Sequence, residues 1–192
     1  MQANERLQQE VALRRAVLAG DSAAWRALYD GAFAELWAYV VWRCAGMRDL
    51  AEDVTQETWL VAVRRVGDFD PRRGRFLSWL RGIAAKALQN QLRVRQRREG
   101  SLTGNEESAA GDESHRREQA ELIAWALAQL PEPYENALRA KYLDLQSVAE
   151  IASGCGETVK TIESRLTRAR EAFRAAYEKQ ASTDVMVRDA EP

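Results

Sequence analysis

The stretch that decides the fold is SVAEIASGCGETVKTIESRLTRAR, residues 147–170. It opens with Ser147 and Glu150 at the spacing of a capping box, in which each residue satisfies a backbone N–H of the other. The offsets at which a helix-turn-helix needs a small packing residue and a tight-turn glycine hold Ala152 and Gly156. We therefore predict a helix-turn-helix, because an ordinary helical hairpin would not explain the capped turn with its glycine.

The second helix of this stretch begins after the turn and repeats apolar residues every three or four positions. The residues that this period turns inward are Val159, Ile162, Leu166, Ala169 and Phe173. The opposite face is polar, as a helix inserted into a major groove requires. The residues predicted to contact duplex DNA are Thr158, Lys160, Thr161, Ser164, Arg168 and, at the border of the face, Arg165.

Charge is spread unevenly along the 192 residues. The formal net charge is −1, yet residues 64–98 hold eleven basic and two acidic residues, whereas residues 99–121 hold seven acidic residues and two arginines. Such segregation produces a strong positive field over one segment. A polyanionic partner and a well-solvated helix surface both fit this pattern.

Composition also divides the chain in two. Residues 100–114 are rich in glycine, serine and acids and contain one large apolar residue, so we expect a flexible linker. No β-alternation competes with the helical periodicity. We predict an all-α protein of two small helical domains joined by a flexible acidic linker, the second domain containing the helix-turn-helix. The predicted ranges are 1–98 for the first domain, 99–114 for the linker, 115–180 for the second domain and 181–192 for a frayed tail.

A long predicted helix at residues 75–98 has two distinct faces. Its apolar stripe, which must pack against the domain, is Phe76, Leu80, Ile83, Ala87 and Val94. The second face, within about 100° of arc, is Arg75, Trp79, Gly82, Lys86, Gln89, Asn90, Arg93 and Arg97. Cations neutralise phosphates, amides bond base edges and an indole stacks on an unpaired base. This face predicts contact with nucleic acid, and the rival interpretation makes Trp79 a simple core residue.

A preceding helix, predicted to begin at Asp49 with Glu52 in capping-box spacing, has a third surface. Its two apolar stripes are Leu50, Val54 and Val61, and Trp59, Val63 and Val66. An acidic group around a leucine lies between them: Asp53, Gln56, Glu57 and Leu60. Acids around an apolar centre suit a basic protein surface. A solvated acidic edge with one stray leucine explains the spacing equally well.

The residues that could carry chemistry are few. Cys44 and Cys155 are far apart with no Cys/His cluster, and His115 is the only histidine, so we expect reduced, mostly buried thiols, no metal, no cofactor and no enzyme. No apolar stretch has the length of a membrane span, and residues 1–6 start no secretory signal. We therefore expect a cytoplasmic protein without a membrane partner.

Several segments resemble the extracytoplasmic-function (ECF) sigma factors of bacterial RNA polymerase, in the order of that family. AEDVTQETW at residues 51–59 resembles the helix that docks on the polymerase, and FLSWL at residues 76–80 resembles the strand-opening region. EIA at 150–152 and TIESRLTRAR at 161–170 resemble the helix-turn-helix that reads the upstream promoter element. The resemblance covers roughly residues 22–178.

The resemblance implies an alternative sigma factor, which binds core RNA polymerase, directs it to specific promoters and helps to open the DNA. The residues implied to bind the clamp helices of the largest polymerase subunit are Asp53, Gln56 and Glu57. The loop at 69–74, with Phe69, Arg72 and Arg73, and the helix after it would melt the minus-ten element and hold a flipped base. The residues implied to contact the minus-thirty-five element are Lys160, Ser164, Arg165 and Arg168. The second domain would also touch the polymerase flap, and an anti-sigma factor often binds members of this family.

The sequence departs from the family pattern at several of these positions. Lys86 stands where the family usually has asparagine and Asn90 where it often has aspartate, so base preference at the minus-ten element does not transfer. Gly154 and Cys155 replace a bulkier turn, and Lys160 occupies a position that is commonly glycine. The residues also leave a second function open, a stand-alone helix-turn-helix regulator whose first domain senses or dimerises. Such a regulator would bind its operator without polymerase and would open no DNA.

Overall fold

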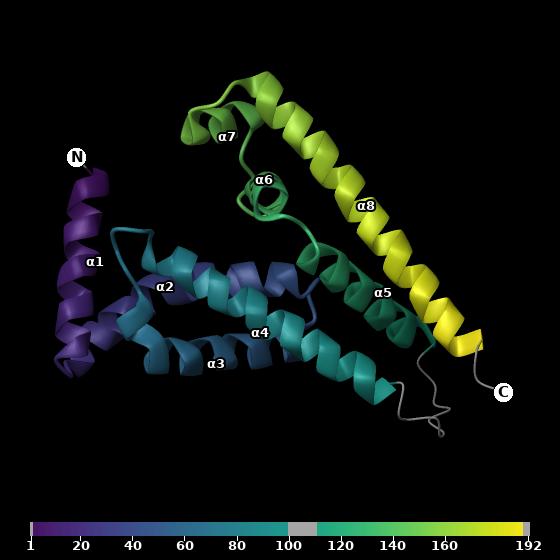
Figure 1. The fold of residues 1–192 in the computed structure, drawn as a ribbon, viewed down its shortest axis with the longest axis horizontal. Coiled ribbons are helices and arrows are strands. Elements are labelled where there is room, and N and C mark those ends of the chain that lie inside the picture. The colour runs from purple at the N-terminus through teal and green to yellow at the C-terminus, as the bar shows by residue number, and fades with distance from the viewer. Residues whose placement is uncertain (1, 100–110, 190–192) are drawn as a thin grey trace. The chain divides into compact units, whose positions relative to one another are not determined.

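The computed structural model describes residues 2–99 and 111–189, and every regular element in these two ranges is a helix. The first range contains α1 (Gln2–Leu18), α2 (Ser22–Arg43), α3 (Arg48–Arg65), the short 3₁₀ helix η1 (Val66–Asp68) and α4 (Phe76–Glu99) (Figure 1). The second contains α5 (Gly111–Ala128), α6 (Glu132–Tyr142), α7 (Val148–Cys155) and α8 (Val159–Asp189). The predicted all-α class is confirmed.

The chain divides into two compact units. One consists of Met1–Val41 with Arg48–Gln91, and the other of Trp42–Met47 with Leu92–Pro192. The division therefore falls inside α4, whereas the sequence predicted a first domain that ends at residue 98. A composition change cannot reveal a division that lies within one uninterrupted helix.

The first unit buries leucines from three helices in one core. Leu36 of α2, Leu50 of α3, and Leu80 and Leu88 of α4 are almost completely buried, and burying one such side chain stabilises a fold by roughly 1.5–3 kcal/mol. Figure 1 shows α1 at a steep angle to α2, α3 and α4. This core holds α3 and α4 in place, so their outer faces are fixed surfaces.

Two helix starts in the first unit test the capping predictions. The Asp21 carboxylate accepts hydrogen bonds from the N–H groups of Ala23 (2.8 Å) and Ala24 (3.3 Å), so Asp21 caps α2 as predicted. The helix α3 begins at Arg48, which places Asp49 inside its first turn. The predicted start at Asp49 is therefore one residue late, a common error at helix ends.

The buried face of α4 is rotated from the predicted stripe. Its buried residues are Phe76, Leu77, Leu80, Ala84, Ala87, Leu88 and Leu92. Ile83 and Val94, which the stripe included, are only half-buried. The centre of the buried arc depends on which helices pack against α4, and periodicity alone does not contain that information.

The second unit has a core built around α8. Helices α5, α6 and α7 all contact α8. The larger buried residues of this core are Leu127, Leu130, Leu138, Ile151, Ile162 and Leu166. The first three come from α5, α6 and the segment between them, and the last three come from the helix-turn-helix, so α5 and α6 pack against the helix-turn-helix.

Two predicted boundaries differ from the structure, and most of the predicted linker lies outside the described residues. Residues 100–110 of the predicted linker are not described. Helix α5 already begins at Gly111, within the range 99–114 assigned to the linker. Helix α8 continues to Asp189, although a frayed tail was predicted from residue 181. The tail contains no proline or glycine before residue 190 to stop the helix.

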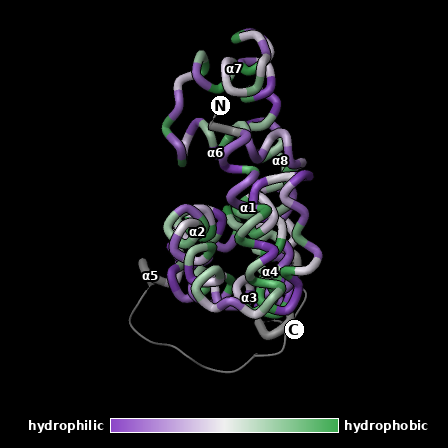
Figure 2. Tube along the Cα trace, turned by 90° about the vertical axis from the view of Figure 1, so that its left-hand side faces the viewer, coloured by the Kyte–Doolittle hydropathy of each residue, from purple (hydrophilic) through white to green (hydrophobic). Residues whose placement is uncertain are grey.

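Each helix mixes hydrophilic and hydrophobic residues, as the alternating purple and green of Figure 2 shows. Within residues 2–99 and 111–189, no helix combines the length and the apolar character needed to cross a bilayer.

Candidate nucleic-acid and protein interfaces

The first helix of the helix-turn-helix begins with the predicted capping box. The Ser147 hydroxyl oxygen accepts from the N–H of Glu150 at 3.2 Å, and the Glu150 carboxylate accepts from the N–H of Ser147 at 2.7 Å. The Ser147 hydroxyl also donates to this carboxylate, and together these bonds lower the pKa of Glu150. Gly156 ends α7 with φ at 67°, a left-handed conformation that glycine adopts without strain. Gly156 thus allows the chain to turn sharply between α7 and α8.

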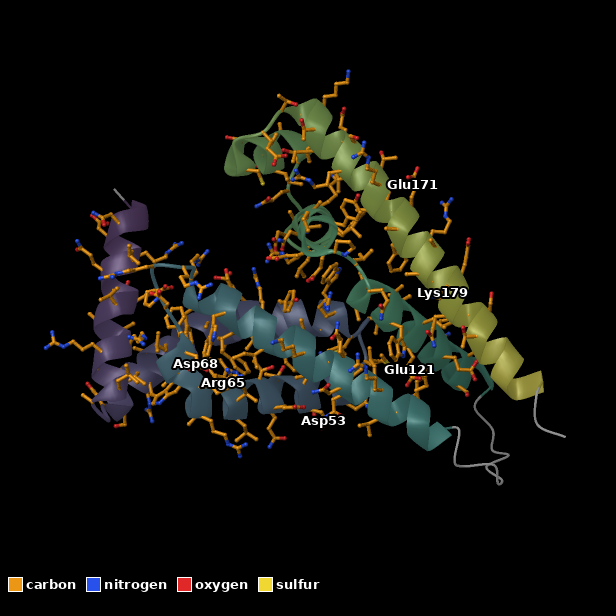
Figure 3. All side chains as sticks on the ribbon, in the orientation of Figure 1. Asp53, Arg65, Asp68, Glu121, Glu171 and Lys179 are labelled. Carbon is orange, nitrogen blue, oxygen red and sulfur yellow. The ribbon has the colours of Figure 1, made fainter. Side chains whose placement is uncertain are left out.

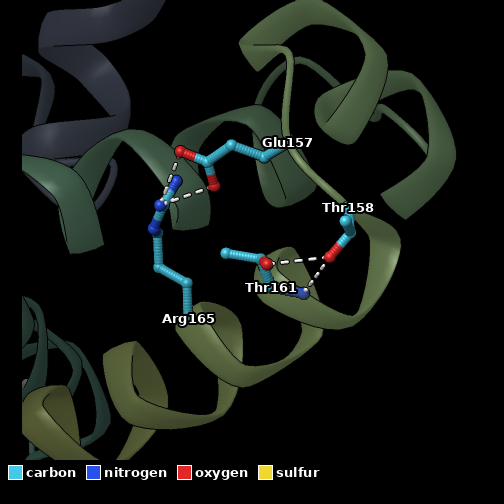
Figure 4. Close-up of polar contacts among 4 residues, drawn as sticks. All are labelled: Glu157, Thr158, Thr161 and Arg165. Atoms are coloured by element: carbon cyan, nitrogen blue, oxygen red, sulfur yellow. Dashed lines mark hydrogen bonds and ion pairs between the residues drawn. The ribbon is translucent and has the colours of Figure 1, made fainter.

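The first turn of α8 is capped from within the same segment. The Thr158 hydroxyl oxygen accepts from the N–H of Thr161 at 3.2 Å, and the two hydroxyls lie 2.8 Å apart (Figure 4). Ile162, Leu166 and Ala169 are buried as predicted. The prediction for Val159 is wrong, because this side chain is 45% exposed in the first turn, ahead of the point where α8 meets its neighbours.

The six residues predicted to contact duplex DNA lie together. They line an open hollow of about 400 Å³ with one further residue: Thr158, Lys160, Thr161, Ser164, Arg165, Arg168 and Tyr134. The tyrosine comes from α6, and the sequence reasoning did not identify it. Its hydroxyl adds a hydrogen-bonding group to the wall of the hollow.

One arginine of this hollow is held in place. The Arg165 Nη2 donates to both carboxylate oxygens of Glu157, at 2.7 and 2.9 Å (Figure 4). This hydrogen-bonded pair raises the pKa of Arg165 and holds its guanidinium in one orientation. Lys160 and Arg168 are exposed, and within the described residues the structure shows no acidic partner for either. They are the more available cations.

The outer face of α4 carries the predicted cations. Arg75, Lys86 and Arg93 are exposed, and their spacing places them along one side of the helix. Gly82 and Asn90 are exposed on the same side. This side presents positive charge, an amide and an approachable backbone in one strip, as a nucleic-acid contact requires.

Two further residues predicted on this strip are half-buried, and one lies outside the described side chains. Trp79 packs its ring 5.7 Å from the Phe76 ring, centroid to centroid, which leaves part of the indole exposed. Gln89 is also half-buried. Arg97 belongs to α4, but its side chain is not among those described. Trp79 therefore both packs in the unit and reaches its surface.

The loop between η1 and α4 separates a buried aromatic residue from exposed arginines. Phe69 is only 1% exposed, and its ring lies 5.2 Å from that of Phe76 and 5.6 Å from that of Trp79. A side chain so buried cannot contact DNA in this conformation, which corrects the prediction for Phe69. Arg72 and Arg73, which follow it, are exposed. The aromatic cluster thus anchors the loop while both arginines stay exposed, Arg72 beside α1.

The acidic face of α3 contains an apolar pair at its centre. Asp53 and Gln56 are exposed, Asp53 on the outer side of the helix (Figure 3). Glu57 is half-buried, and its carboxylate accepts from Gln91 at 3.3 Å. Leu60 is 51% exposed, and Val63, one turn later, is 56% exposed. Sequence reasoning missed Val63 because it assigned this valine to a packed stripe.

Val63 changes how this face is interpreted. Two neighbouring apolar side chains at more than half exposure are harder to explain as chance than a single leucine. At the end of the same helix, Arg65 and Asp68 form an ion pair at 2.7 Å (Figure 3). The surface combines two exposed apolar side chains with acids on their N-terminal side, while the exposed Arg64 follows Val63 directly. Its acidic part favours a basic protein partner.

The structure describes both cysteines and the histidine. Cys44 is buried as expected, but Cys155 is exposed because it lies in the last turn of α7, next to Gly156. His115 lies in α5, where its ring nitrogen is 3.1 Å from the Gln119 amide. Within the described residues no three His, Cys, Asp or Glu side chains gather as a metal site.

Comparisons with known families match the two halves of the chain separately. The family model of sigma-70 region 2 matches residues 31–98, and that of sigma-70 region 4 matches residues 120–173. The first contains α3 and α4, and the second contains the helix-turn-helix. The candidate surfaces on α3, α4 and α8 therefore lie within the two segments that match sigma-factor family models.

Individual relatives extend the match over most of the chain. The ECF RNA polymerase sigma factor SigL of Mycobacterium tuberculosis (strain ATCC 25618 / H37Rv) is 34% identical over 172 residues, which cover 86% of this chain and 95% of the relative. SigC of M. tuberculosis (strain CDC 1551 / Oshkosh) is 30% identical over 172 residues, 87% of this chain and 90% of the relative. BldN of Streptomyces coelicolor (strain ATCC BAA-471 / A3(2) / M145) is 29% identical over 160 residues, 78% of this chain and 60% of the relative.

These matches decide between the two functions that the residues left open. A stand-alone regulator would share the helix-turn-helix but has no need of region 2, whereas both regions are matched here in sigma-factor order. Core RNA polymerase and promoter DNA are the partners of such a factor. The chain belongs to the extracytoplasmic-function sigma factors, the alternative factors with which RNA polymerase initiates transcription at specific promoters.

Proposed function

We propose that this sigma factor divides promoter recognition between α8, which reads the minus-thirty-five element as duplex, and α4 with the loop at 69–74, which holds the opened minus-ten element. The observation that carries the proposal is the hollow on the second unit, where all six residues predicted for duplex contact lie together. The protein makes and breaks no covalent bond and needs no cofactor. It acts in the cytoplasm, where the polymerase works.

On α8, the geometry supports division of labour among the cations. Lys160 and Arg168 supply mobile charge for phosphates or base edges, and Arg165 supplies a guanidinium oriented by Glu157. Thr161 and Ser164 provide hydroxyls that bond to either a base or a phosphate. The caps at Ser147 and Thr158 hold the starts of α7 and α8, so the outward face of α8 keeps one direction relative to α5 and α6.

On α4, the exposed strip suits a separated strand. Arg75, Lys86 and Arg93 neutralise successive phosphates, and the exposed part of Trp79 stacks on an unpaired base. Opening duplex DNA costs a few kcal/mol per unstacked base. Capture of the extruded base on this strip offsets that cost, so binding energy drives the opening.

On α3, the face with Asp53, Gln56, Glu57, Leu60 and Val63 docks on core polymerase. The two apolar side chains provide burial and the acids provide complementarity to basic clamp helices. The second unit also touches the polymerase flap. An anti-sigma factor that covered either surface would block initiation.

The test uses the full chain, purified core polymerase and a promoter found by mapping transcript starts after overexpression. We expect Lys160→Ala and Arg168→Ala each to weaken promoter binding by the complex roughly tenfold, the effect of losing one specific DNA contact. Affinity for core polymerase alone should stay unchanged. The matched control is Arg174→Ala, an exposed arginine further along α8 outside the hollow.

Two outcomes contradict the proposal. Failure of the unaltered chain to bind core polymerase contradicts the docking role. Equal promoter affinity of the Lys160, Arg168 and Arg174 variants contradicts the assignment of the hollow to the minus-thirty-five element.

A further inference from the structure

Helix α1 lies outside the region 2 match, which begins at residue 31, yet it contacts both ends of the loop before α4. The Arg14 Nη2 donates to the carbonyl oxygen of Gly67 at 2.8 Å, at the start of the loop. Both carboxylate oxygens of Glu10 lie 3.3 Å from the N–H of Phe76, at its end. Since positions four apart share one face of a helix, a single turn of α1 holds the loop at two points.

The Glu10 contact supplies a cap that α4 lacks locally. The first N–H groups of a helix have no partner within it. A neighbouring Ser, Thr, Asp or Asn usually provides an acceptor, but Arg75 precedes α4 and its side chain only donates. The Glu10 carboxylate takes that place from another helix, and its negative charge favours the positive end of the α4 dipole.

The Arg14 contact fixes the other end of the loop. Gly67 lies in η1, which ends directly before the buried Phe69. A guanidinium donor makes a stronger bond to this carbonyl than a neutral donor would. Between the two fixed points, the Asp70 carboxylate accepts from the N–H of Arg72 at 3.0 Å, which tightens the turn. With both ends and the centre held, Arg72 and Arg73 have a set direction.

We propose that Glu10 and Arg14 are positioning residues for promoter opening, which clamp the loop at 69–74 in the conformation that receives the separated strand. The inference rests on the proposed function of this loop. Ordering the loop before DNA arrives removes a conformational cost from the opening step. Helix α1 therefore contributes to promoter opening by positioning the loop, although it lies outside both family-model matches.

The first measurement probes the loop in the free full-length protein. We expect Glu10→Ala and Arg14→Ala each to speed tryptic cleavage after Arg72 and Arg73 roughly tenfold, as expected for loss of one helix cap or one charged hydrogen bond. The thermal midpoint should fall by only about 4–8 °C, as expected for loss of about 1 kcal/mol in a small domain. Matched controls on the same helix are Glu5→Ala and Arg6→Ala, whose side chains are exposed.

The second measurement compares promoter opening by the polymerase complex, read from permanganate reactivity of unpaired thymines. Glu10→Ala and Arg14→Ala should lower this reactivity several-fold at saturating factor, while affinity for core polymerase stays unchanged. The double variant should lose little more than the worse single one, because both act on one loop. Glu10→Gln keeps an oxygen that accepts from the N–H of Phe76, so this variant should retain most of the opening. It tests the clamp even if Glu10→Ala folds poorly.

The outcomes separate this inference from the proposed function. If the unaltered chain opens no promoter with core polymerase, the proposed function itself fails. If it opens the promoter and the Glu10 and Arg14 variants open it equally well, the clamp is overturned and the proposed function stands. Slower opening that follows from weaker polymerase binding, or that Glu5→Ala reproduces, also overturns the clamp.

Discussion

The two helices that meet DNA in the proposed function begin in opposite ways. The first turn of α8 is capped by Thr158, whose hydroxyl oxygen accepts a hydrogen bond from the N–H of Thr161, three residues later. The first turn of α4 is capped by Glu10, 66 residues earlier in the chain. One helix start is thus built by its own sequence and the other by the tertiary structure of its unit.

This difference teaches how each surface depends on its surroundings. The capping box at Ser147 and the cap at Thr158 both close within three residues, so the helix-turn-helix needs little from elsewhere to set its angle. The start of α4 needs α1 to be docked and the aromatic cluster at Phe69 to be packed. Substitutions outside the helix itself should therefore destabilise the start of α4 more than the start of α8.

The largest expected effect is at the aromatic anchor of the loop. Phe69→Ala removes a ring that contacts Phe76 and Trp79, and should cost the first unit about 3–5 kcal/mol in free energy of unfolding. Hydrogen exchange resolved by peptide should show lost protection in α3 and α4. Protection in α7 and α8 should stay unchanged.

Phe69→Leu is the matched control, because it keeps most of the apolar volume and should cost about 1 kcal/mol. Unchanged protection in the Phe69→Ala variant would contradict the buried position and return Phe69 to the DNA-facing role that the sequence suggested. Equal loss in both units would contradict the contrast between a locally and a remotely built helix start.

What the sequence could predict follows the same contrast. Ser147, Gly156 and Thr158 act on neighbours within a few positions, so spacing and residue type were sufficient to predict the turn and the outward face of α8. The exposure of Lys160 and Arg168 followed from the same period.

The features that sequence missed depend on contacts between distant segments. The burial of Phe69 requires Phe76 and Trp79 to come close, and the cap on Phe76 requires Glu10. The exposed position of Val63 on α3 depends on where neighbouring helices stop covering it. Periodicity describes one helix at a time and contains none of this information.

A smaller effect is expected at the locally capped turn. Ser147→Ala removes the hydroxyl that accepts from the Glu150 N–H, and should cost the second unit about 1 kcal/mol. Amides of α7 should lose protection, whereas those of α3 and α4 should not. Ser153→Ala, an exposed serine inside α7, is the control. If both variants lost protection equally, the capping box would contribute no stability. The claim that α7 is capped by its own neighbouring residues, unlike α4, would then fail.

The smallest expected effect is the pH dependence of the same turn. Hydrogen bonds from Ser147 lower the pKa of Glu150 below its ordinary value of 4.5, so folding favours the ionised carboxylate. A lowered folded-state pKa gives stability that is present above the unfolded value and is lost as the pH falls through the folded one. Glu150→Gln cannot ionise, so the stability difference between the wild type and this variant should shrink from about pH 7 to about pH 3. Urea unfolding monitored in α7 and α8 measures this difference at each pH. A difference that stayed constant, or grew on acidification, would show that the charge on Glu150 does not contribute to the cap.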